Sequence, residues 1–390
     1  MRIFFSVGEP SGDQHAARLI REIRSRRPDL EASGFGGPEM EAAGLHSHFR
    51  LTDLAVMGFF RVLPLIWKFY KLIRVGERVL REERPDAVVL VDFPGFNWWI
   101  ARKASKLGIP VLYYLPPQLW AWGPWRIKRV RKTVDYVLCG LKFEQEWYEQ
   151  RGVQAEYVGH PFFDEVQEHQ LDQGFLEAFE SKDQRNIGIL PGSRGHEVAH
   201  NWPVIVKVIS RVAQQHPDTR FLVACFSEAH RSKCEELLRD TSDLGCTLPI
   251  RFFVGKTPEV IELSDCCLMV SGSVSLEMLA RATPAVVIYY FNWLPGHITK
   301  LLIQCKFGSL PNLMADREIL PEFYPQGTGD TISLQVADKL CKWLDSNGEL
   351  EQVETDLRHL RSDVMRTGAI SKAAEAILSR IDPVSISRAA

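Results

Sequence analysis

The stretch 186-NIGILPGSRGHE-197 has the pattern of a strand, a turn and the start of a helix. An apolar run of strand type leads into a turn that contains Gly192, Ser193 and Arg194. From Val198 onward, apolar residues recur at three- and four-residue spacings, which predicts a helix. Such a turn presents free backbone N–H groups, a hydroxyl and a guanidinium to an anion. We interpret it as a phosphate-binding turn; the alternative is an ordinary turn with a solvated arginine.

Strand and helix patterns alternate on both sides of this stretch. In the second half, apolar runs of strand type recur at 221–225, 250–254, 266–270 and 286–290. In the first half, similar runs occur at 2–7, 32–35, 86–91, 111–115, 136–139 and 157–158. Two such series predict an α/β protein with two Rossmann-like domains that face each other across a cleft. A polar stretch between the series gives expected bounds of 1–170 and 185–365, with a C-terminal helix and tail at 366–390.

The composition is that of a globular protein too long for one core. The chain has 390 residues, 45% of them hydrophobic and 25% charged, and a net charge of −2. These values argue against a disordered protein and against a nucleic-acid partner. The eight cysteines form no CxxC pair, so we expect thiols of a reducing compartment and no zinc site. We recognise no signal peptide and no window of about 20 uncharged apolar residues, and therefore expect a cytoplasmic protein.

Two acids directly follow strands of the first half. Glu9 lies in the turn 8–13, whose glycine spacing differs from the GxGxxG fingerprint, so a nicotinamide cofactor is disfavoured. Asp92 follows an apolar run typical of a central strand. Because open α/β sheets bind ligands at the carboxyl ends of their strands, both acids are candidates for catalysis. Capping is the alternative for Asp92, and it is an equal alternative for Ser11 and Asp13.

The segment 54–74 is the most apolar and aromatic part of the chain. It contains Trp67 and Phe69 together with basic residues and no acid. This pattern is typical of a helix that lies in a membrane interface. A core helix whose lysines and arginines extend into solvent has the same composition, so both interpretations remain open.

A second group of aromatic and basic residues follows the strand at 111–115. Trp120 and Trp122 suit a rigid wall against a sugar face or an acyl chain, and equally a packed loop. Arg126 opens a basic cluster directly after them, which favours an anionic, lipidic substrate over a merely solvated helix face. His160 lies between Gly159 and Pro161, where it could donate to a phosphate or a sugar hydroxyl, although a structural role is the commoner one.

The second half contains further candidates for nucleotide binding. Ser271, Gly272 and Ser273 form another turn of small residues that opens a helix and could bind phosphate. Glu277 follows in the first helical turns, where a carboxylate could hold a ribose diol or simply complement the helix dipole. Asn312 could present its amide to a base or a phosphate.

Six motifs in this order resemble the lipid-A-disaccharide synthase family over nearly the whole chain: 8-GEPSGD-13, 92-DFPGFN-97, 120-WAW-122, 159-GHP-161, 190-LPGSR-194 and 309-SLPNL-313. The resemblance implies the GT-B fold and transfer of 2,3-diacylglucosamine from UDP-2,3-diacylglucosamine to the 6-hydroxyl of 2,3-diacylglucosamine 1-phosphate (lipid X). The products are the β-1,6 lipid A disaccharide and UDP. It further implies peripheral contact with the inner face of the cytoplasmic membrane, and an oligomer is compatible with it.

The resemblance also implies roles for the candidate residues. Inversion needs one base, which we expect to be Asp92, with Glu9 in reserve. The leaving UDP is expected at Gly192, Ser193, Arg194, Ser271, Gly272, Ser273, Glu277 and Asn312. The acceptor and its lipid chains are expected at Ser11, Trp120, Trp122, Arg126, His160, Trp67 and Phe69. No cofactor and no metal are expected, because GT-B enzymes neutralise the diphosphate with helix N-termini and cations, and we find no DxD pair.

Two other functions remain open from the sequence. A UDP-sugar 2-epimerase shares the architecture, but an enzyme of soluble sugars has no need of the apolar and basic segment 54–74. A non-catalytic nucleotide- or lipid-binding protein would leave Glu9 and Asp92 without a task.

Overall fold

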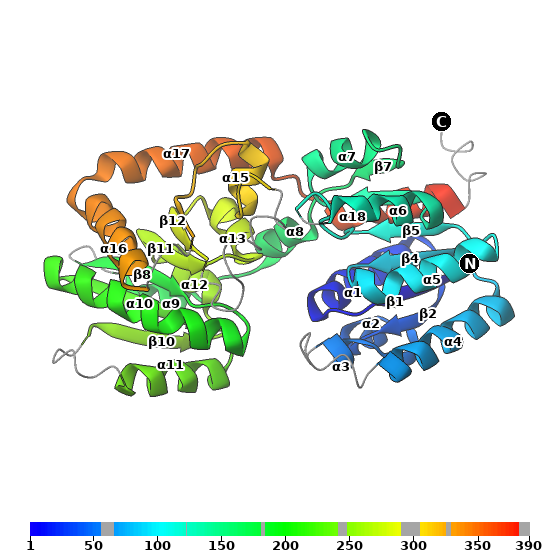
Figure 1. Cartoon of the computed structure of the whole chain (residues 1–390), viewed down its shortest axis with the longest axis horizontal. Coiled ribbons are helices and arrows are strands. Elements are labelled where there is room, and N and C mark those ends of the chain that lie inside the picture. Colours follow the sequence, from blue (N-terminus) through cyan, green and yellow to red (C-terminus); the bar gives the residue numbers. More distant parts are fainter. Residues whose placement is uncertain are drawn as a thin grey trace. The chain divides into compact units, whose positions relative to one another are not determined.

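The computed structural model describes residues 1–55, 66–121, 123–180, 184–240, 248–289, 305–324 and 329–381 (Figure 1). The chain divides into two compact units. Unit 1 comprises Met1–Glu165 and the C-terminal segment from Arg366, and unit 2 comprises Val166–Met365. The chain therefore leaves unit 1 once and returns to it.

Unit 1 is built on a parallel sheet of seven strands in the order β3-β2-β1-β4-β5-β6-β7. The strands are β1 (Arg2–Val7), β2 (Glu31–Gly36), β3 (His46–Arg50), β4 (Ala87–Val91), β5 (Val111–Tyr114), β6 (Tyr136–Cys139) and β7 (Ala155–Tyr157). Every residue of β4 is buried, as expected for a central strand covered on both faces. The strand order reverses between β1 and β4, which creates a switch point at the carboxyl edge of the sheet.

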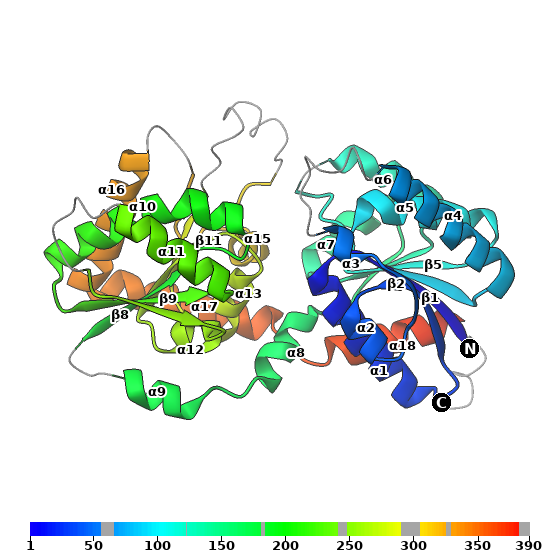
Figure 2. The ribbon, with the colours of Figure 1, turned by 90° about the horizontal axis from the view of Figure 1, so that it is seen from below.

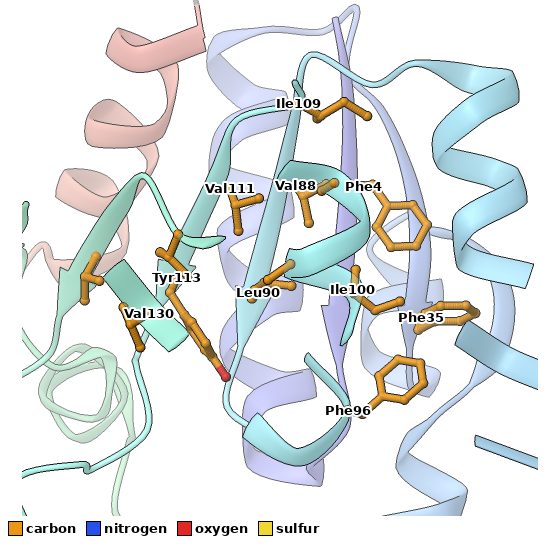
Figure 3. Close-up of a cluster of buried hydrophobic side chains, with 14 of the residues drawn as sticks. Phe4, Phe35, Val88, Leu90, Phe96, Ile100, Ile109, Val111, Tyr113 and Val130 are labelled. Carbon is orange, nitrogen blue, oxygen red and sulfur yellow. The ribbon is translucent and has the colours of Figure 1, made fainter. Parts of the chain in front are cut away.

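Helices cover both faces of this sheet (Figure 2). The helices of unit 1 are α1 (Pro10–Arg26), α2 (Pro38–Ala42), α3 (Thr52–Ala55), α4 (Ile66–Glu83), α5 (Pro94–Lys106), η3 (Pro124–Arg126), α6 (Ile127–Thr133), α7 (Lys142–Glu149) and α18 (Ala369–Ile381). The division between the two units falls within α8 (Pro161–Glu168). On one face, Phe4 and Leu90 of the sheet pack against Phe96 and Ile100 of α5 (Figure 3). On the other face, α18 packs beside α1, so the end of the chain completes the core of unit 1.

Unit 2 repeats the plan with a parallel sheet of six strands in the order β10-β9-β8-β11-β12-β13. The strands are β8 (Arg185–Leu190), β9 (Thr219–Cys225), β10 (Ile250–Val254), β11 (Cys266–Val270), β12 (Ala285–Ile288) and β13 (Glu322–Phe323). The helices are α9 (Gln173–Phe179), α10 (Gly195–Gln215), α11 (Glu228–Asp240), α12 (Thr257–Glu262), α13 (Val274–Arg281), α15 (Leu310–Ala315), α16 (Gly329–Asp345) and α17 (Asn347–Val364). Its switch point lies between β8 and β11.

The predicted α/β class with two Rossmann-like series is confirmed. Two edge strands, β3 and β13, were not predicted, because β3 reads HSHFR without an apolar alternation and β13 has only two residues. Of the apolar segment 54–74, residues 56–65 lie outside the described part, and α4 begins at Ile66. Among the helices that are described, none has both the length and the apolarity that crossing a bilayer requires.

Candidate active site

The turns that follow β1 and β4 lie side by side at the switch point of unit 1. A Cβ atom on Gly8 would lie 2.3 Å from the ring of Phe93, so glycine is required at this position. A Cβ atom on Gly12 would lie 3.2 Å from Oδ2 of Asp92 and would press on the carboxylate. Glu9 is the N-cap residue of α1 between these glycines. The local sequence thus holds the start of α1 directly against the predicted base.

The backbone of Asp92 and Phe93 is left-handed, with φ of 46° and 43°. This conformation costs a non-glycine residue roughly 1–2 kcal/mol, so the surroundings must stabilise it. The carbonyl oxygen of Asp92 accepts a hydrogen bond from Asn97 Nδ2 at 2.8 Å and one from the hydroxyl of Tyr113 at 2.6 Å. The strained turn is therefore fixed from both α5 and β5.

Asn97 joins the two central strands at this point. It is fully buried, and its Nδ2 also donates to the carbonyl oxygens of Ser6 and Val91 at 3.0 and 3.1 Å. Its Oδ1 accepts from the Ser6 hydroxyl at 2.6 Å. Asn97 was predicted only as part of the motif 92–97. Its role could have been recognised from its position, because an amide one turn into the helix after a strand-end acid can satisfy strand carbonyls.

The pKa of the Asp92 carboxyl is raised to about 8. Burial is the largest cause, and the negative charges of Glu9 and Glu144 add to it. A carboxylate with a pKa near neutrality is a much stronger base than an ordinary aspartate, yet remains partly ionised at the working pH. This is the property that proton removal from a sugar hydroxyl requires.

Glu144 is a second carboxyl group that the sequence analysis did not single out. It is buried on α7 and accepts a hydrogen bond from Nε1 of Trp120 at 2.9 Å. Its other oxygen accepts from the backbone N–H of Leu141 at 3.2 Å. Burial raises the pKa of Glu144 to about 7. Trp120, one of the predicted acceptor residues, is thereby buried and fixed in orientation.

Asp13 and Ser11, the two possible caps in the first turn of α1, have different surroundings. The buried carboxylate of Asp13 accepts from the backbone N–H groups of Gly37, Glu39 and Met40 at 2.8–3.2 Å. It caps α2 and not its own helix. Ser11 is exposed beside Glu9, in a position from which its hydroxyl can reach a ligand.

His160 follows β7 at the same edge of the sheet. Burial, with a smaller contribution from the charge of His15, lowers the pKa of His160 to about 3. Its Nδ1 accepts from the backbone N–H of Phe162 at 3.2 Å, which leaves the neutral ring with Nε2 as its N–H donor. His160 is therefore suited to donate a hydrogen bond to a sugar or phosphate oxygen and unsuited to carry a charge.

Large aromatic side chains are exposed on the α4, α5 and η3 elements. Trp67 is 73% exposed, Tyr70 52%, Trp99 50% and Trp125 61%. Because α4 contacts α5, and α6 contacts both α5 and η3, these elements form one neighbouring group, which we call the aromatic face. Exposed lysines and arginines accompany it, among them Lys68, Lys71, Arg74, Lys128 and Arg129.

Other predicted lipid-contacting residues have different surroundings. Phe69 is half-buried and packs against the rings of Phe93 and Phe96 at 6.2 and 6.0 Å, so it supports the aromatic face from beneath. The guanidinium groups of Arg126 and Arg129 lie 5.4 and 4.8 Å from the ring centre of Trp98. Trp122, also a predicted acceptor residue, lies outside the described part of the chain.

In unit 2, the turn after β8 leads into α10, and its residues Ser193, Arg194 and Gly195 are exposed. Gly192 has φ of 113°, and a Cβ atom there would lie 3.0 Å from Glu197. Glu197 accepts from the backbone N–H of Arg194 at 3.2 Å and from its guanidinium at 2.8 Å. The side chain of Arg194 is 67% exposed, and Ser193 beside it is also exposed. Among the described residues, the guanidinium of Arg194 pairs with Glu197 at the surface, and such an ion pair is weak enough to exchange for a phosphate.

The turn after β11 lies next to this one, because β8 and β11 are parallel neighbours. Gly272 and Ser273 are exposed, and no atom lies within 4 Å of the position of a Cβ on Gly272. Ser271 is partly buried, while Ser275 is turned inward and donates its hydroxyl to the carbonyl of Gly272 at 2.8 Å. The structure therefore brings together two glycine-containing turns at the switch point of unit 2.

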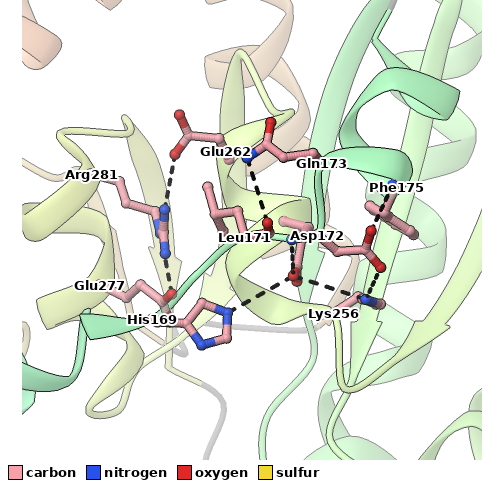
Figure 4. Close-up of polar contacts among 10 residues, drawn as sticks. His169, Leu171, Asp172, Gln173, Phe175, Lys256, Glu262, Glu277 and Arg281 are labelled. Carbon is pink, nitrogen blue, oxygen red and sulfur yellow. Dashed lines mark hydrogen bonds and ion pairs between the residues drawn. The ribbon is translucent and has the colours of Figure 1, made fainter. Parts of the chain in front are cut away.

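Glu277 lies inside a network of charged side chains (Figure 4). Its carboxylate accepts from Nε of Arg281 at 3.2 Å, and Arg281 also pairs with Glu262 at 3.0 Å. Burial raises the pKa of Glu277, and the charge of Arg281 opposes this shift. In this conformation its carboxylate is engaged by the protein.

Asn312 has no donor or acceptor left for a ligand. Its Nδ2 donates to the Leu320 carbonyl and to Glu322, each at 2.8 Å, and its Oδ1 accepts from the backbone N–H groups of Ile319 and Leu320. Glu322 in turn accepts from the backbone N–H groups of Gly308 and Ser309 at 2.9 and 2.8 Å. Asn312 and Glu322 together fix the loop before α15. Asn312 was predicted to contact the ligand, whereas Glu322 was not predicted.

Comparison with known proteins identifies the family. A family model described as lipid-A-disaccharide synthetase matches residues 3–378. The chain belongs to the lipid-A-disaccharide synthase family. It is 35% identical over 382 residues to the lipid-A-disaccharide synthase of Anaeromyxobacter dehalogenans, with 97% of each chain covered. It is 34% identical over 374 residues to that of Pseudomonas putida, with 96% of each covered.

Solved structures share the fold at low sequence identity. A putative UDP-N-acetylglucosamine 2-epimerase of Listeria monocytogenes superimposes with a TM-score of 0.64 at 12% identity, covering 98% of this chain and 97% of the other. MurG of Acinetobacter baumannii gives 0.60 at 14% identity, covering 96% and 98%. These likenesses support the GT-B fold alone. As a member of the lipid-A-disaccharide synthase family, the chain is a glycosyltransferase of lipid A biosynthesis, and the epimerase alternative is not favoured.

Proposed function

We propose that this enzyme transfers 2,3-diacylglucosamine from UDP-2,3-diacylglucosamine to the 6-hydroxyl of 2,3-diacylglucosamine 1-phosphate, with inversion at the anomeric carbon. The β-1,6 disaccharide and UDP are the products. Family membership supports the reaction, and one observation carries the mechanism. Asp92, with a pKa raised to about 8, occupies the switch point of the acceptor unit.

Asp92 removes the proton from the 6-hydroxyl as its oxygen attacks the anomeric carbon. The charge of Glu9 keeps Asp92 basic, and the neutral ring of His160 donates to the acceptor. Ser11, Trp120, Trp122 and Arg126 complete the acceptor site, where an aromatic wall suits the apolar face of a sugar and a guanidinium suits its phosphate.

The leaving UDP binds to unit 2. Arg194 exchanges Glu197 for the diphosphate, and the backbone N–H groups of Gly192 and Ser193 add neutral donors. The parallel turn at Ser271, Gly272 and Ser273 receives the same diphosphate. Glu277 binds the ribose after it releases Arg281, and Asn312 acts by holding the loop before α15 in place. Helix N-termini and a cation thus stabilise the developing charge.

The acyl chains of both substrates require an apolar surface, and the aromatic face supplies one. Exposed tryptophans with basic neighbours are suited to the interface of an anionic bilayer. We infer that the enzyme acts as a peripheral protein on the inner face of the cytoplasmic membrane, where Trp67 enters the lipid surface.

The direct test is incubation of the purified chain with both monosaccharide substrates, followed by mass spectrometry. We expect one disaccharide 1-phosphate for each UDP released. A parallel incubation with UDP-N-acetylglucosamine alone tests the epimerase. Formation of a 2-epimer without any disaccharide from the lipid pair would overturn the proposal.

A further inference from the structure

The mechanism above assigns no role to Glu144, although Glu144 is hydrogen-bonded to Trp120 of the proposed acceptor site. The side chain is a carboxylate with only 4% exposure on α7. As the third helical residue it accepts from the Leu141 N–H at 3.2 Å, a capping bond that a partly exposed residue makes equally well. Burying an acid is costly. Its burial therefore requires a reason beyond the end of a helix.

The hydrogen bond to Trp120 is one such reason. Nε1 of Trp120 donates to Oε1 of Glu144 at 2.9 Å, and the indole ring meets the ring of Phe143 edge-on at 4.9 Å. One turn further along α7, the hydroxyl of Tyr148 donates to the carbonyl of Pro117 at 2.9 Å. The segment after β5 is thus fastened to α7 at two points, and Glu144 determines which way the indole faces.

The charge of Glu144 is the other reason. Among the described residues, the titratable groups with an electrostatic effect on Asp92 are Glu9 from α1 and Glu144 from α7, and both raise its pKa. The charge of Asp92 also raises the pKa values of the Tyr113 and Tyr114 hydroxyls on β5. Burial raises these pKa values more, so both hydroxyls stay neutral. The pKa of Glu144 is about 7, so Glu144 is ionised in the pH range where Asp92 titrates.

We propose that Glu144 is a positioning residue of the acceptor site, which orients Trp120 as a wall of that site and uses its negative charge to strengthen Asp92 as the base. This inference rests on the proposed function, because it assigns Asp92 the proton transfer. The two effects separate by substitution, since a glutamine keeps the acceptor oxygen for Trp120 and loses only the charge.

The first measurement is the pH profile of kcat/KM for Glu144→Gln, with saturating donor. We expect the acidic limb of the profile to move to lower pH by about half a unit or more. At pH values below the limb, kcat/KM relative to its plateau should then be about threefold higher than in the unaltered enzyme. The acceptor KM should stay within about twofold of the original value. Glu149→Gln is the matched control, because Glu149 lies on the same helix but is exposed and pairs with Gln145. If the acidic limb of Glu144→Gln lies at the same pH as that of Glu149→Gln, the proposed effect of the Glu144 charge on Asp92 is wrong.

The second measurement is the acceptor KM of Trp120→Phe, which keeps a ring and removes the N–H donor. We expect the acceptor KM to rise about tenfold and the donor KM to stay unchanged. A phenylalanine ring has no N–H group, so the Glu144 carboxylate can no longer fix its orientation. Glu144→Ala removes the acceptor oxygen and should raise the acceptor KM similarly. In the double variant of Trp120→Phe with Glu144→Ala, the two increases should not multiply, because both substitutions remove the same bond. Independent effects, or an unchanged acceptor KM in Trp120→Phe, would overturn the positioning role. Turnover by the unaltered chain shows separately whether the proposed reaction occurs.

Discussion

A carboxyl group whose folded pKa lies above its unfolded value costs stability once it is ionised. The protonated carboxyl of Asp92 therefore stabilises the fold fully below about pH 4, and this stabilisation is lost as the pH rises through about 8. Asp92→Asn should therefore lower kcat by roughly 10²–10⁴ while the chain melts at the same temperature or higher at pH 8. Steady-state kinetics measures the change in kcat, and calorimetry measures the change in melting temperature. Near-normal turnover would shift the base role to Glu9.

The same shift predicts the pH dependence of the unaltered enzyme. A base works only when deprotonated, so kcat/KM should fall about tenfold for each pH unit below 8, the pKa of Asp92. The overlapping titration of Glu144 near 7 should make the limb shallower than a single ionisation at its upper end. A profile that is flat from pH 6 to 9 would contradict proton removal by Asp92.

Arg194 is predicted to act on the leaving group. Arg194→Ala should weaken UDP binding by roughly 10- to 100-fold and lower kcat as well, because a charge-assisted hydrogen bond contributes about 1.5–3 kcal/mol. Arg231→Ala is a suitable control, since Arg231 is partly exposed and pairs with Glu235 four residues along its helix, much as Arg194 pairs with Glu197. Titration calorimetry with UDP measures both. Equal affinities in the two variants would count against the phosphate site.

Single residues differed in how far the sequence could reveal them. Glu9, Asp92 and Arg194 could be singled out as candidates because each lies in the turn after a strand, and such turns are recognisable locally. Asn97 and Glu144 were not, since their partners are distant in sequence; Asn97 bonds Ser6 from 91 residues away. Asn312 was assigned to the ligand because a free amide and a satisfied one look alike in a sequence.

At the scale of elements, the buried strands were predictable, whereas the edge strands β3 and β13 were not. β4 is a continuous apolar run because both of its faces are covered. β3 has one strand neighbour and partly exposed polar side chains, which follow no period. The aromatic composition of 66–74 was evident, but which side of α4 faces solvent depends on its packing against α5.

The aromatic face leads to a prediction about membrane binding. Trp67→Ser together with Trp125→Ser should reduce flotation with vesicles of mixed anionic and zwitterionic phospholipid severalfold, because both indoles are more than half exposed. Phe69 is left unchanged, since it packs inside. Phe226→Ser, which removes a similarly exposed aromatic from unit 2, is the control. Flotation equal to that of the control would exclude the aromatic face as the membrane contact.

At the scale of the whole molecule, one carboxylate fastens both ends of unit 1. Asp164 on α8 accepts from the backbone N–H groups of Gly368 and Ile370 at 2.6 and 3.1 Å, and so caps α18. Asp164→Ala should lower the melting temperature of unit 1 by a few degrees, in keeping with roughly 1–2 kcal/mol for a lost cap. Asp172→Ala removes the exposed cap of α9 in unit 2 for comparison. If Asp164→Ala and Asp172→Ala lower the melting temperature equally, Asp164 stabilises the protein no more than an exposed helix cap does.

The return of α18 to unit 1 has a consequence for biosynthesis. Unit 2 is one uninterrupted stretch, Val166–Met365, whereas unit 1 lacks the helix that covers α1 until the segment after Arg366 has been translated. On the ribosome, the later-made unit can therefore complete its core before the earlier one does, the reverse of the usual order. During that interval the apolar side of α1, with Leu19 and Ile23, has only the rest of its own unit to cover it. Nascent chains arrested before Arg366 should consequently depend on chaperones more than full-length ones.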